Sequence, residues 1–509
     1  MNRLVKLAGL ALLLCAPAAA KAEWRAAETR HFTFYSESND RELEKLAARL
    51  ESYDKLMRMA TGTSDEEEPI KVRIYEVEDM GDVEQALGLS DSGVAGFYHS
   101  NILGPFAVTP RRTLNNDLHF TPALVLHHEY AHHFMLQYFP SIYPPWYVEG
   151  FAELIGSSKQ LSDGKIGYGM PARHRGSEIA VNWVNVADLL LTPPHKLRYL
   201  DLYAQGWALT HFLTFSKERS PQMRAYLTAL RAGKPAEEAA KAFGDLKALD
   251  REARRYVLAG NFDYRPVAVE IARPAIKSFR MLSPGEAATI PAVIALRDDE
   301  LSLYRKAGER ERESKLRAAN LKKIREQVRR FPKDPFVLHL LATAEYTAGN
   351  YADSEAAADR LLAVQPRHAR GMALKSLNVA RAAGALQGAA RTARAGEARA
   401  LAVKANRADP DDTLPLLAFY ESFRLAGEKP SKAAIDNLAA VVATRPDDTS
   451  ARQLLVDQFA ADGRWALAIE TLRPIANSPH ESPRRVAARE QMAKLEAELA
   501  KAGGQASTS

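Results

Sequence analysis

Two histidines between residues 121 and 154 have the spacing to bind one divalent metal ion, and a glutamate lies next to the first of them. His128, Glu129 and His132 form the string H-E-x-x-H. On a helix, positions i and i+4 lie on one face, so His128 and His132 can direct two imidazole nitrogens at one ion. Glu129 then points beside the ion, where a metal-bound water would lie. This arrangement is typical of metal-assisted hydrolysis.

A second string, W-x-x-E-G-x-A-E, runs from Trp146 to Glu153. Thr121 suits the N-cap of a first helix and Pro122 its first position. A proline-rich turn then separates this helix from a second one that begins near Trp146. Glu149 and Glu153 are four residues apart on the second helix and therefore face the same way. The alternative is a surface helix with two solvated histidines, which the strongly apolar flanks disfavour.

Three other histidines near these strings are interpreted differently. His127 and His133 lie on other faces of the first helix, so we interpret them as packing or surface residues. His211 lies in the apolar segment Tyr203–Leu213 and is interpreted as a core histidine with its hydrogen bonds satisfied.

The two strings together resemble the gluzincin zinc metallopeptidases, in which a glutamate on a second helix is the third zinc ligand. The resemblance implies that His128, His132 and Glu149 bind Zn²⁺ and that Glu129 is the general base. The spacing from His132 to Glu149 is slightly shorter than in the best-known members, so the turn must be tight. Glu153 matches a carboxylate that hydrogen-bonds a zinc-binding histidine in some gluzincins. A surface salt bridge is an equal alternative for Glu153.

The resemblance covers about residues 24–264, and one bacterial, peptidase MA-like family of unknown function matches especially well. Its members share a strand near His31, the W-x-x-E-G-x-A-E string and the string Y-x-Q-x-W-A-L-x-H-F-L, which begins here at Tyr203. Tyr203 is a candidate to donate a hydrogen bond to the developing oxyanion. A buried tyrosine that anchors its helix is the alternative.

The family resemblance also implies a peptide or protein substrate that pairs with an edge strand. Gly96–Tyr98 and Phe106–Val108 are candidates for that strand, and an internal strand is the alternative for either. The glutamate string with which aminopeptidases recognise a substrate amine does not precede the metal helix. This favours an endopeptidase.

The N-terminal segment 1–22 has the pattern of a secretory signal peptide. A basic start precedes the apolar stretch Leu7–Leu14, and Ala20–Ala22 is a small-x-small cleavage site. Cys15 is the only cysteine, so the exported chain would contain no disulfide. Lipoprotein anchoring at Cys15 is the weaker alternative, because the bulky Leu14 precedes it. These features predict a periplasmic or secreted protein.

Charge and hydropathy exclude other classes of partner. Removal of the leader with its three basic residues leaves a net charge of +3. Nothing in this balance favours nucleic acid or an anionic membrane as a partner. No later segment is long and apolar enough for a transmembrane span in the mature chain.

From about residue 301 the chain becomes rich in Ala, Leu and Arg at helical spacing. Prolines then recur at intervals of 34, 44, 36 and 33, at Pro332, Pro366, Pro410, Pro446 and Pro479. Three of these intervals are close to the tetratricopeptide (TPR) period of about 34 residues. The region resembles degenerate TPR repeats with an insertion in the unit from Arg367 to Pro410. An unrelated helical bundle is the alternative.

The sequence therefore predicts an α+β fold followed by an all-α solenoid. Residues 1–22 are a signal peptide, 23–264 a gluzincin-like metallopeptidase domain, 265–300 a connecting segment, 301–500 TPR-like repeats and 501–509 a disordered tail. The predicted function is peptide-bond hydrolysis, with the repeats recruiting the substrate or a protein partner. The competing hypothesis is a non-catalytic scaffold whose front domain is a degenerate peptidase.

Overall fold

The computed structural model describes most of the chain from residue 23 onward. The described residues are 23–66, 70–89, 96–112, 121–139, 143–181, 183–192, 196–198, 201–296, 307–476 and 483–506. The predicted signal peptide and Cys15 lie outside these ranges. No described helix is long and apolar enough to cross a membrane.

A six-stranded mixed sheet forms the centre of the front half, in the order β4-β5-β3-β2-β1-β9. The strands are β1 (Arg25–Glu28), β2 (Phe32–Ser36), β3 (Val72–Val77), β4 (Phe97–Asn101), β5 (Gly104–Pro110) and β9 (Ser278–Met281). β2, β3 and β5 are parallel, whereas β1, β4 and β9 pair antiparallel with their neighbours. Of the two candidate edge strands, the one at Phe97 lies at the edge, and the one at Phe106 is internal.

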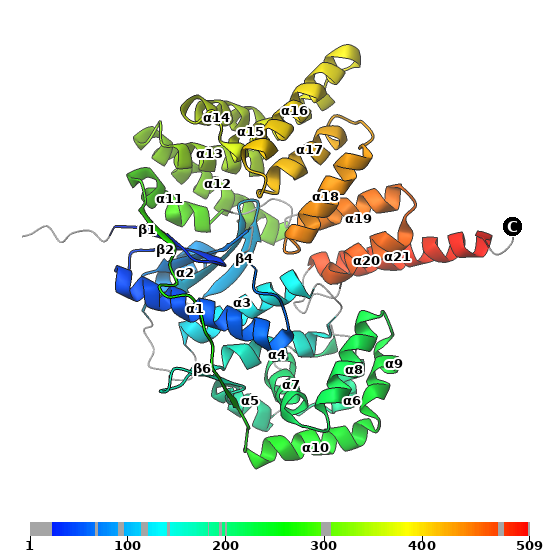
Figure 1. Cartoon of the computed structure of the whole chain (residues 1–509). Helices are drawn as coiled ribbons and strands as arrows, with labels where there is room; N and C mark the ends of the chain where they lie inside the picture. Colours follow the sequence, from blue (N-terminus) through cyan, green and yellow to red (C-terminus); the bar gives the residue numbers. More distant parts are fainter. Residues whose placement is uncertain are drawn as a thin grey trace, which may run out of the picture.

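Both faces of this sheet are covered, and alternate residues of each strand enter different cores. Phe34 and Ile74 face α1 (Asp40–Thr61) and α3 (Pro122–Tyr138). Tyr75 and Phe106 face the opposite way and share one apolar core with the repeat helices. Figure 1 shows α1 and α3 on one side of the sheet and the repeat helices on the other. The front half and the repeats are therefore built around a common sheet.

A helical lobe follows α3 on the side of the sheet opposite the first repeat helices (Figure 1). Its helices are α4 (Pro145–Gly156), α5 (Gly176–Val181), α6 (Val186–Leu191), α7 (Gly206–Phe215), α8 (Ser220–Arg231), α9 (Ala236–Ala240) and α10 (Leu246–Ala259). A small sheet of β6 (Lys159–Gln160), β7 (Ile166–Tyr168) and β8 (Arg265–Val267) lies beside them. α4 packs between α3 and α7, which places it at the centre of the lobe.

The helical repeats expected from the sequence are present. The helices are α12 (Ala307–Arg330), α13 (Pro335–Thr347), α14 (Tyr351–Val364), α15 (Ala369–Gly384), α16 (Gly388–Ala408), α17 (Leu414–Arg424), α18 (Lys432–Thr444), α19 (Thr449–Ala461), α20 (Trp465–Ala476) and α21 (Pro483–Ala506). Each packs against the next, as in a solenoid. The array curves around the sheet towards α3 (Figure 1).

Three details of the predicted organisation differ from the structure. The connecting segment 265–300 contains β9, an edge strand of the main sheet, and α11 (Pro284–Ile294). The insertion expected between Arg367 and Pro410 is instead a lengthening, because α15 and α16 have 16 and 21 residues where α13 and α14 have 13 and 14. The disordered tail predicted from residue 501 was wrong for residues 501–506. These extend α21, which the helix-favouring Lys, Glu and Ala residues before them support.

Candidate metal site

Local sequence signals set the two helices that carry the site. Thr121 caps α3, and its side-chain oxygen accepts a hydrogen bond from the backbone N–H of Leu124 at 3.2 Å. Pro122 occupies the first turn. α4 begins at Pro145, again with proline in the first turn, where its missing N–H costs nothing. The two helices predicted from the sequence are therefore present, with these starts.

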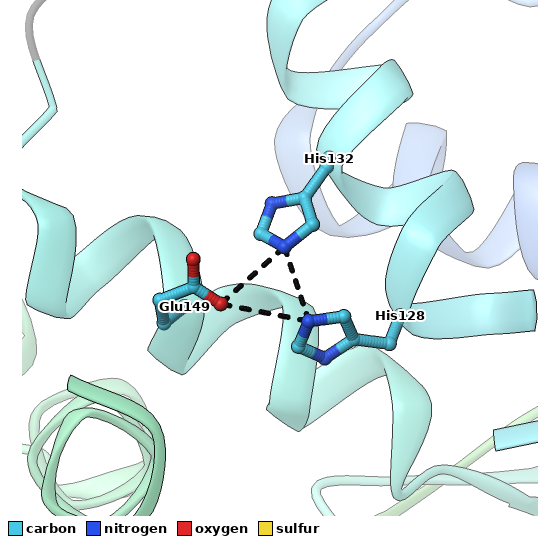
Figure 2. Close-up of side chains that lie close together, drawn as sticks. All are labelled: His128, His132 and Glu149. Carbon is cyan, nitrogen blue, oxygen red and sulfur yellow. Dashed lines mark hydrogen bonds and ion pairs between the residues drawn. The ribbon is translucent and has the colours of Figure 1, made fainter. Parts of the chain in front are cut away.

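The structure brings the three predicted ligands together (Figure 2). The Nε2 atoms of His128 and His132 are 3.0 Å apart. One carboxylate oxygen of Glu149 lies 3.5 Å from Nε2 of His128 and 3.4 Å from Nε2 of His132. The three side chains point at one another from two neighbouring helices.

These separations fit a tetrahedral zinc site. Ligand atoms at about 2.0–2.1 Å from a zinc ion lie about 3.3 Å apart along the edges of a tetrahedron. The three observed separations, 3.0, 3.4 and 3.5 Å, bracket this value. Two imidazoles and one carboxylate are also a common protein ligand set for catalytic zinc. Glu149 is 1 % exposed, and a charged group so buried requires a compensating charge.

Without a metal ion, a proton shared by the same groups supplies that charge. Burial lowers the pKa of His132, but the charge and hydrogen bond of Glu149 outweigh this and raise the pKa to about 9. Burial raises the pKa of Glu149. The two imidazoles lower it by more, so the net pKa of Glu149 is well below its usual value. The three groups thus form an anion–cation cluster in which a divalent metal would compete with protons.

Glu153 lies behind His128 on the side opposite the ligand atoms. One carboxylate oxygen of Glu153 is 3.4 Å from Nδ1 of His128, and the other is 2.6 Å from Nε2 of His174. Arg175 adds hydrogen bonds of 2.7 and 3.2 Å to the same carboxylate. Burial raises the pKa of Glu153, but the contact with His174 and the charges of His128 and Arg175 lower it to about 2. Glu153 is a buried anion, so the surface salt bridge considered for it is excluded.

Tyr203 packs against the first ligand. It lies in a π-helical turn, η3 (Asp201–Gln205), directly before α7. The ring of Tyr203 stacks on the ring of His128 with centroids 5.7 Å apart and an interplanar angle of 11°. The guanidinium of Arg175 is 4.9 Å from the centroid of the Tyr203 ring. These contacts fix the orientation of His128, and the role of the Tyr203 hydroxyl stays a prediction.

Glu129 lies on the same face of α3 as His133, which contacts Tyr98 of the edge strand β4. Glu129 is partly exposed, and its charge acts on His132 and on Tyr98 of β4. The carboxylate predicted to be the general base is therefore near both His132 and the edge strand. This is where an extended substrate paired with β4 would pass.

Glycines allow the helices of the site to approach closely. A Cβ added to Gly150 of α4 would lie 2.3 Å from the carbonyl oxygen of Gly206 in α7. A Cβ on Gly206 would lie 2.5 Å from the carbonyl oxygen of Trp146. Because Gly150 follows Glu149, this contact sets the position of Glu149 relative to α7. It also brings η3, which precedes α7 and carries Tyr203, close to α4.

A second buried cluster of charged side chains, on α1 and at His31, contacts α3 through Tyr130. Tyr130 of α3 donates a hydrogen bond of 2.7 Å to Asp54, which also pairs with Arg58 at 2.6 Å. His31 Nδ1 is 2.8 Å from Glu51 and 3.4 Å from Asp54. His31, Glu51 and Asp54 are close enough to hold a metal. The two anions are instead balanced by Arg58 and by a histidine whose pKa is raised, so this cluster is a structural network.

The remaining histidines take structural positions. His127 is buried and stacks on Tyr53 with centroids 3.5 Å apart. His133 is buried, with Nδ1 2.8 Å from the Tyr98 hydroxyl. For His211 the core interpretation is confirmed, because Nε2 donates to the carbonyl of Gly169 at 2.7 Å in the protein interior.

Sequence reasoning missed two residues of the site, His174 and Arg175. Both lie in a 3-10 turn, η1 (Arg173–Arg175), and contact Glu153 from 21 and 22 residues away. The sequence showed a short basic loop there, without any periodic pattern that links it to α4. A buried glutamate needs cationic partners, and that requirement was the available signal.

Comparisons with known proteins add little. No protein-family model and no curated protein matches the chain. Among solved structures, a thermophilic TPR protein from Thermus thermophilus matches with 21% identity and a TM-score of 0.31. The match covers 37% of this chain and 94% of that protein.

Proposed function

We propose that this protein is an exported zinc metallopeptidase of the gluzincin type, in which Glu129 acts as general base. The observation that carries the proposal is the group of three ligand atoms within 3.0–3.5 Å of one another, from His128, His132 and Glu149. The zinc, when bound, would polarise the scissile carbonyl and make a water more acidic. An isolated surface H-E-x-x-H string would have neither a third ligand nor a buried carboxylate behind its first histidine.

The protein side of the reaction follows from positions on α3 and α4. Glu129, beside the ligands and partly exposed, takes the proton from the attacking water and passes it to the leaving amine. The carboxylate of Glu153, 3.4 Å from Nδ1 of His128, favours a proton on Nδ1 and so leaves Nε2 for the metal. Tyr203 holds the plane of the His128 ring, and its hydroxyl is a candidate donor to the oxyanion.

The proposed substrate is a peptide or protein in extended form. β4 is an edge strand next to α3, so a substrate strand can add to the sheet by backbone hydrogen bonds. Strand addition recognises backbone rather than chain ends, which agrees with an endopeptidase.

A non-catalytic scaffold is the second candidate, and the helical repeats favour it. Stacked helix pairs offer extended surfaces for protein partners, whatever the front half does. In that case the histidines and Glu149 would form a proton-linked structural cluster. Metal content and turnover separate the two candidates.

The test compares the full mature chain with the Glu129→Gln variant, with fluorescein-labelled casein as the probe. The amide cannot accept a proton, so turnover should fall at least 10³-fold while bound zinc stays at one per chain. Glu178→Gln is the control, because Glu178 contacts Arg175 but none of the proposed ligands. Comparison of cleaved protein termini in wild type and Glu129→Gln would then identify the natural substrate. Equal turnover of both forms would refute the general-base assignment.

A further inference from the structure

The turn between α18 and α19 of the repeats contacts the strand and helix that border the candidate metal site. Arg445 donates hydrogen bonds from one nitrogen to the hydroxyl of Ser100 at 2.7 Å and to the carbonyl of Asn101 at 3.3 Å. Ser100 in turn donates to Asp447. Arg445 and Ser100 are 345 residues apart in the sequence, so the contact depends on how the whole repeat array is placed.

The same turn touches the metal helix directly. Gln137 of α3 donates a hydrogen bond of 3.3 Å to the carbonyl of Thr444. One turn earlier on α3, His133 contacts Tyr98 of β4 at 2.8 Å. β4, α3 and the repeat turn therefore meet at one place, on the helix face that also carries Glu129.

This contact is built around a buried ion pair. The side chains of Arg445 and Asp447 are each 4% exposed and lie 2.8 Å apart. Burial raises the pKa of Asp447, but the charge and hydrogen bond of Arg445 lower it, so the carboxylate stays ionised. A buried ion pair is a poor source of stability, because desolvation of both charges offsets most of their attraction. It does, however, fix the geometry of the groups that it contacts.

A second anchor holds the tip of the same hairpin. Arg370 of α15 donates to the carbonyls of Ile102 and Leu103, between β4 and β5, and pairs with Asp412 at 2.6 Å. An edge strand joined to the sheet on one side is free to shift, so two anchors from the repeats limit its movement.

We propose that Arg445 is a positioning residue for the substrate, because it fixes β4 against α3 from the repeat array. This proposal rests on the peptidase function proposed above and deepens it. The repeats then contribute to the active site itself, in addition to any partner they bind on their outer surfaces. Substrate affinity should depend on a residue that lies in the repeats, far beyond the last metal ligand in the sequence.

The test uses the full mature chain and compares Arg445→Met with Arg325→Met. Arg325 makes a bidentate pair with Glu345 between α12 and α13 and has no hydrogen bond to β4, so it is the control for loss of an ion pair within the repeats. Hydrogen exchange of residues 97–101 should become at least 10-fold faster in Arg445→Met only. With labelled casein, KM should rise about 10-fold with a smaller change in kcat, and zinc should stay at one per chain.

Two further variants keep the result interpretable. Arg445→Lys retains a cation with several donors and should restore most of the protection and of the affinity for casein. Ser100→Ala leaves the ion pair intact, so it should fold even if Arg445→Met does not, and should raise KM by a smaller factor.

The outcomes also separate this proposal from the proposed function. Exchange rates and KM in Arg445→Met that equal those in Arg325→Met would overturn the positioning role while leaving the peptidase intact. A wild-type chain without zinc and without Glu129-dependent turnover would instead overturn the proposed peptidase function. It would also overturn the proposed role of Arg445 in substrate binding. The exchange data would then still measure how firmly the repeats hold β4.

Discussion

A carboxylate oxygen of Glu153 lies 3.4 Å from Nδ1 of His128, on the side of the imidazole away from the other ligands. The same carboxylate is held by His174 and Arg175, so its position does not depend on a metal ion. His128 is therefore oriented by a carboxylate that needs no metal ion to hold it in place.

Replacement of Glu153 should weaken zinc binding without abolishing it. Glu153→Gln removes the negative charge behind His128, and loss of such a partner typically lowers metal affinity 10- to 100-fold. Competition with a chromogenic chelator measures the affinity. Glu178→Gln, which loses only a contact to Arg175, should bind zinc as tightly as wild type. Equal affinity of the Glu153 variant would show that the contact with His128 does not affect the metal.

A methyl group at position 150 should disturb the site through the packing of α4 on α7. Gly150→Ala places a Cβ 2.3 Å from the Gly206 carbonyl, so the helices must separate, at a cost of about 1–3 kcal/mol in the free energy of unfolding. Zinc affinity should fall with it. The control is Gly396→Ala in α16, where the added methyl meets nothing within 4 Å. That variant should gain up to about 1 kcal/mol from helix propensity. Similar melting temperatures of the two variants would contradict the close approach.

The buried network below α3 should make stability depend on pH. Burial lowers the pKa of His31, but Glu51 and Asp54 raise it above the usual value of about 6.5. A raised pKa stabilises the fold fully below about pH 6.5, and this contribution is lost as the pH rises through the folded-state value. The melting temperature of wild type should therefore decline above pH 6.5 more steeply than that of His31→Gln. Tyr130→Phe, which loses a hydrogen bond to Asp54 but no proton in this range, should melt lower with the wild-type slope.

The front half should not fold without the repeats. Tyr75 and Phe106 lie on the sheet face that packs against repeat helices, and both are buried there. A chain that ends at residue 296 would expose this face and should aggregate, whereas the full chain should unfold in one main calorimetric transition. A soluble 23–296 fragment with native helix content would refute the common core.

Local signals made the centre of the site predictable. The i,i+4 spacing of His128 and His132 and the cap at Thr121 depend on one helix, and the sequence shows both directly. Glu149 required the resemblance to a known family, because the turn between α3 and α4 decides whether it reaches the histidines. The structure brings Glu149 within 3.5 Å of both histidines, and its role as a ligand stays a proposal.

The other parts depend on contacts between distant segments, which periodicity does not reveal. The sequence predicted a linker around Phe279. That segment is instead β9, whose partner β1 lies about 250 residues earlier in the chain, and no local pattern reveals such a pairing. Arg445 reaches Ser100 only because the repeat array curves around the sheet. Tyr75 and Phe34 are buried on opposite faces of the main sheet, and each face is covered by a different part of the chain. Their burial therefore also depends on contacts between distant segments.

The zinc content of the purified mature chain, after saturation with zinc and removal of excess, tests the central claim most directly. We expect one zinc per wild-type chain, bound by His128, His132 and Glu149. We expect less than about 0.1 zinc per chain in His128→Ala and in Glu149→Ala, since each variant loses one of the three proposed protein ligands. His127→Ala, on another face of α3, should keep one zinc if it folds. A wild-type chain that retains no zinc, or a Glu149→Ala chain that retains as much as wild type, would contradict the account.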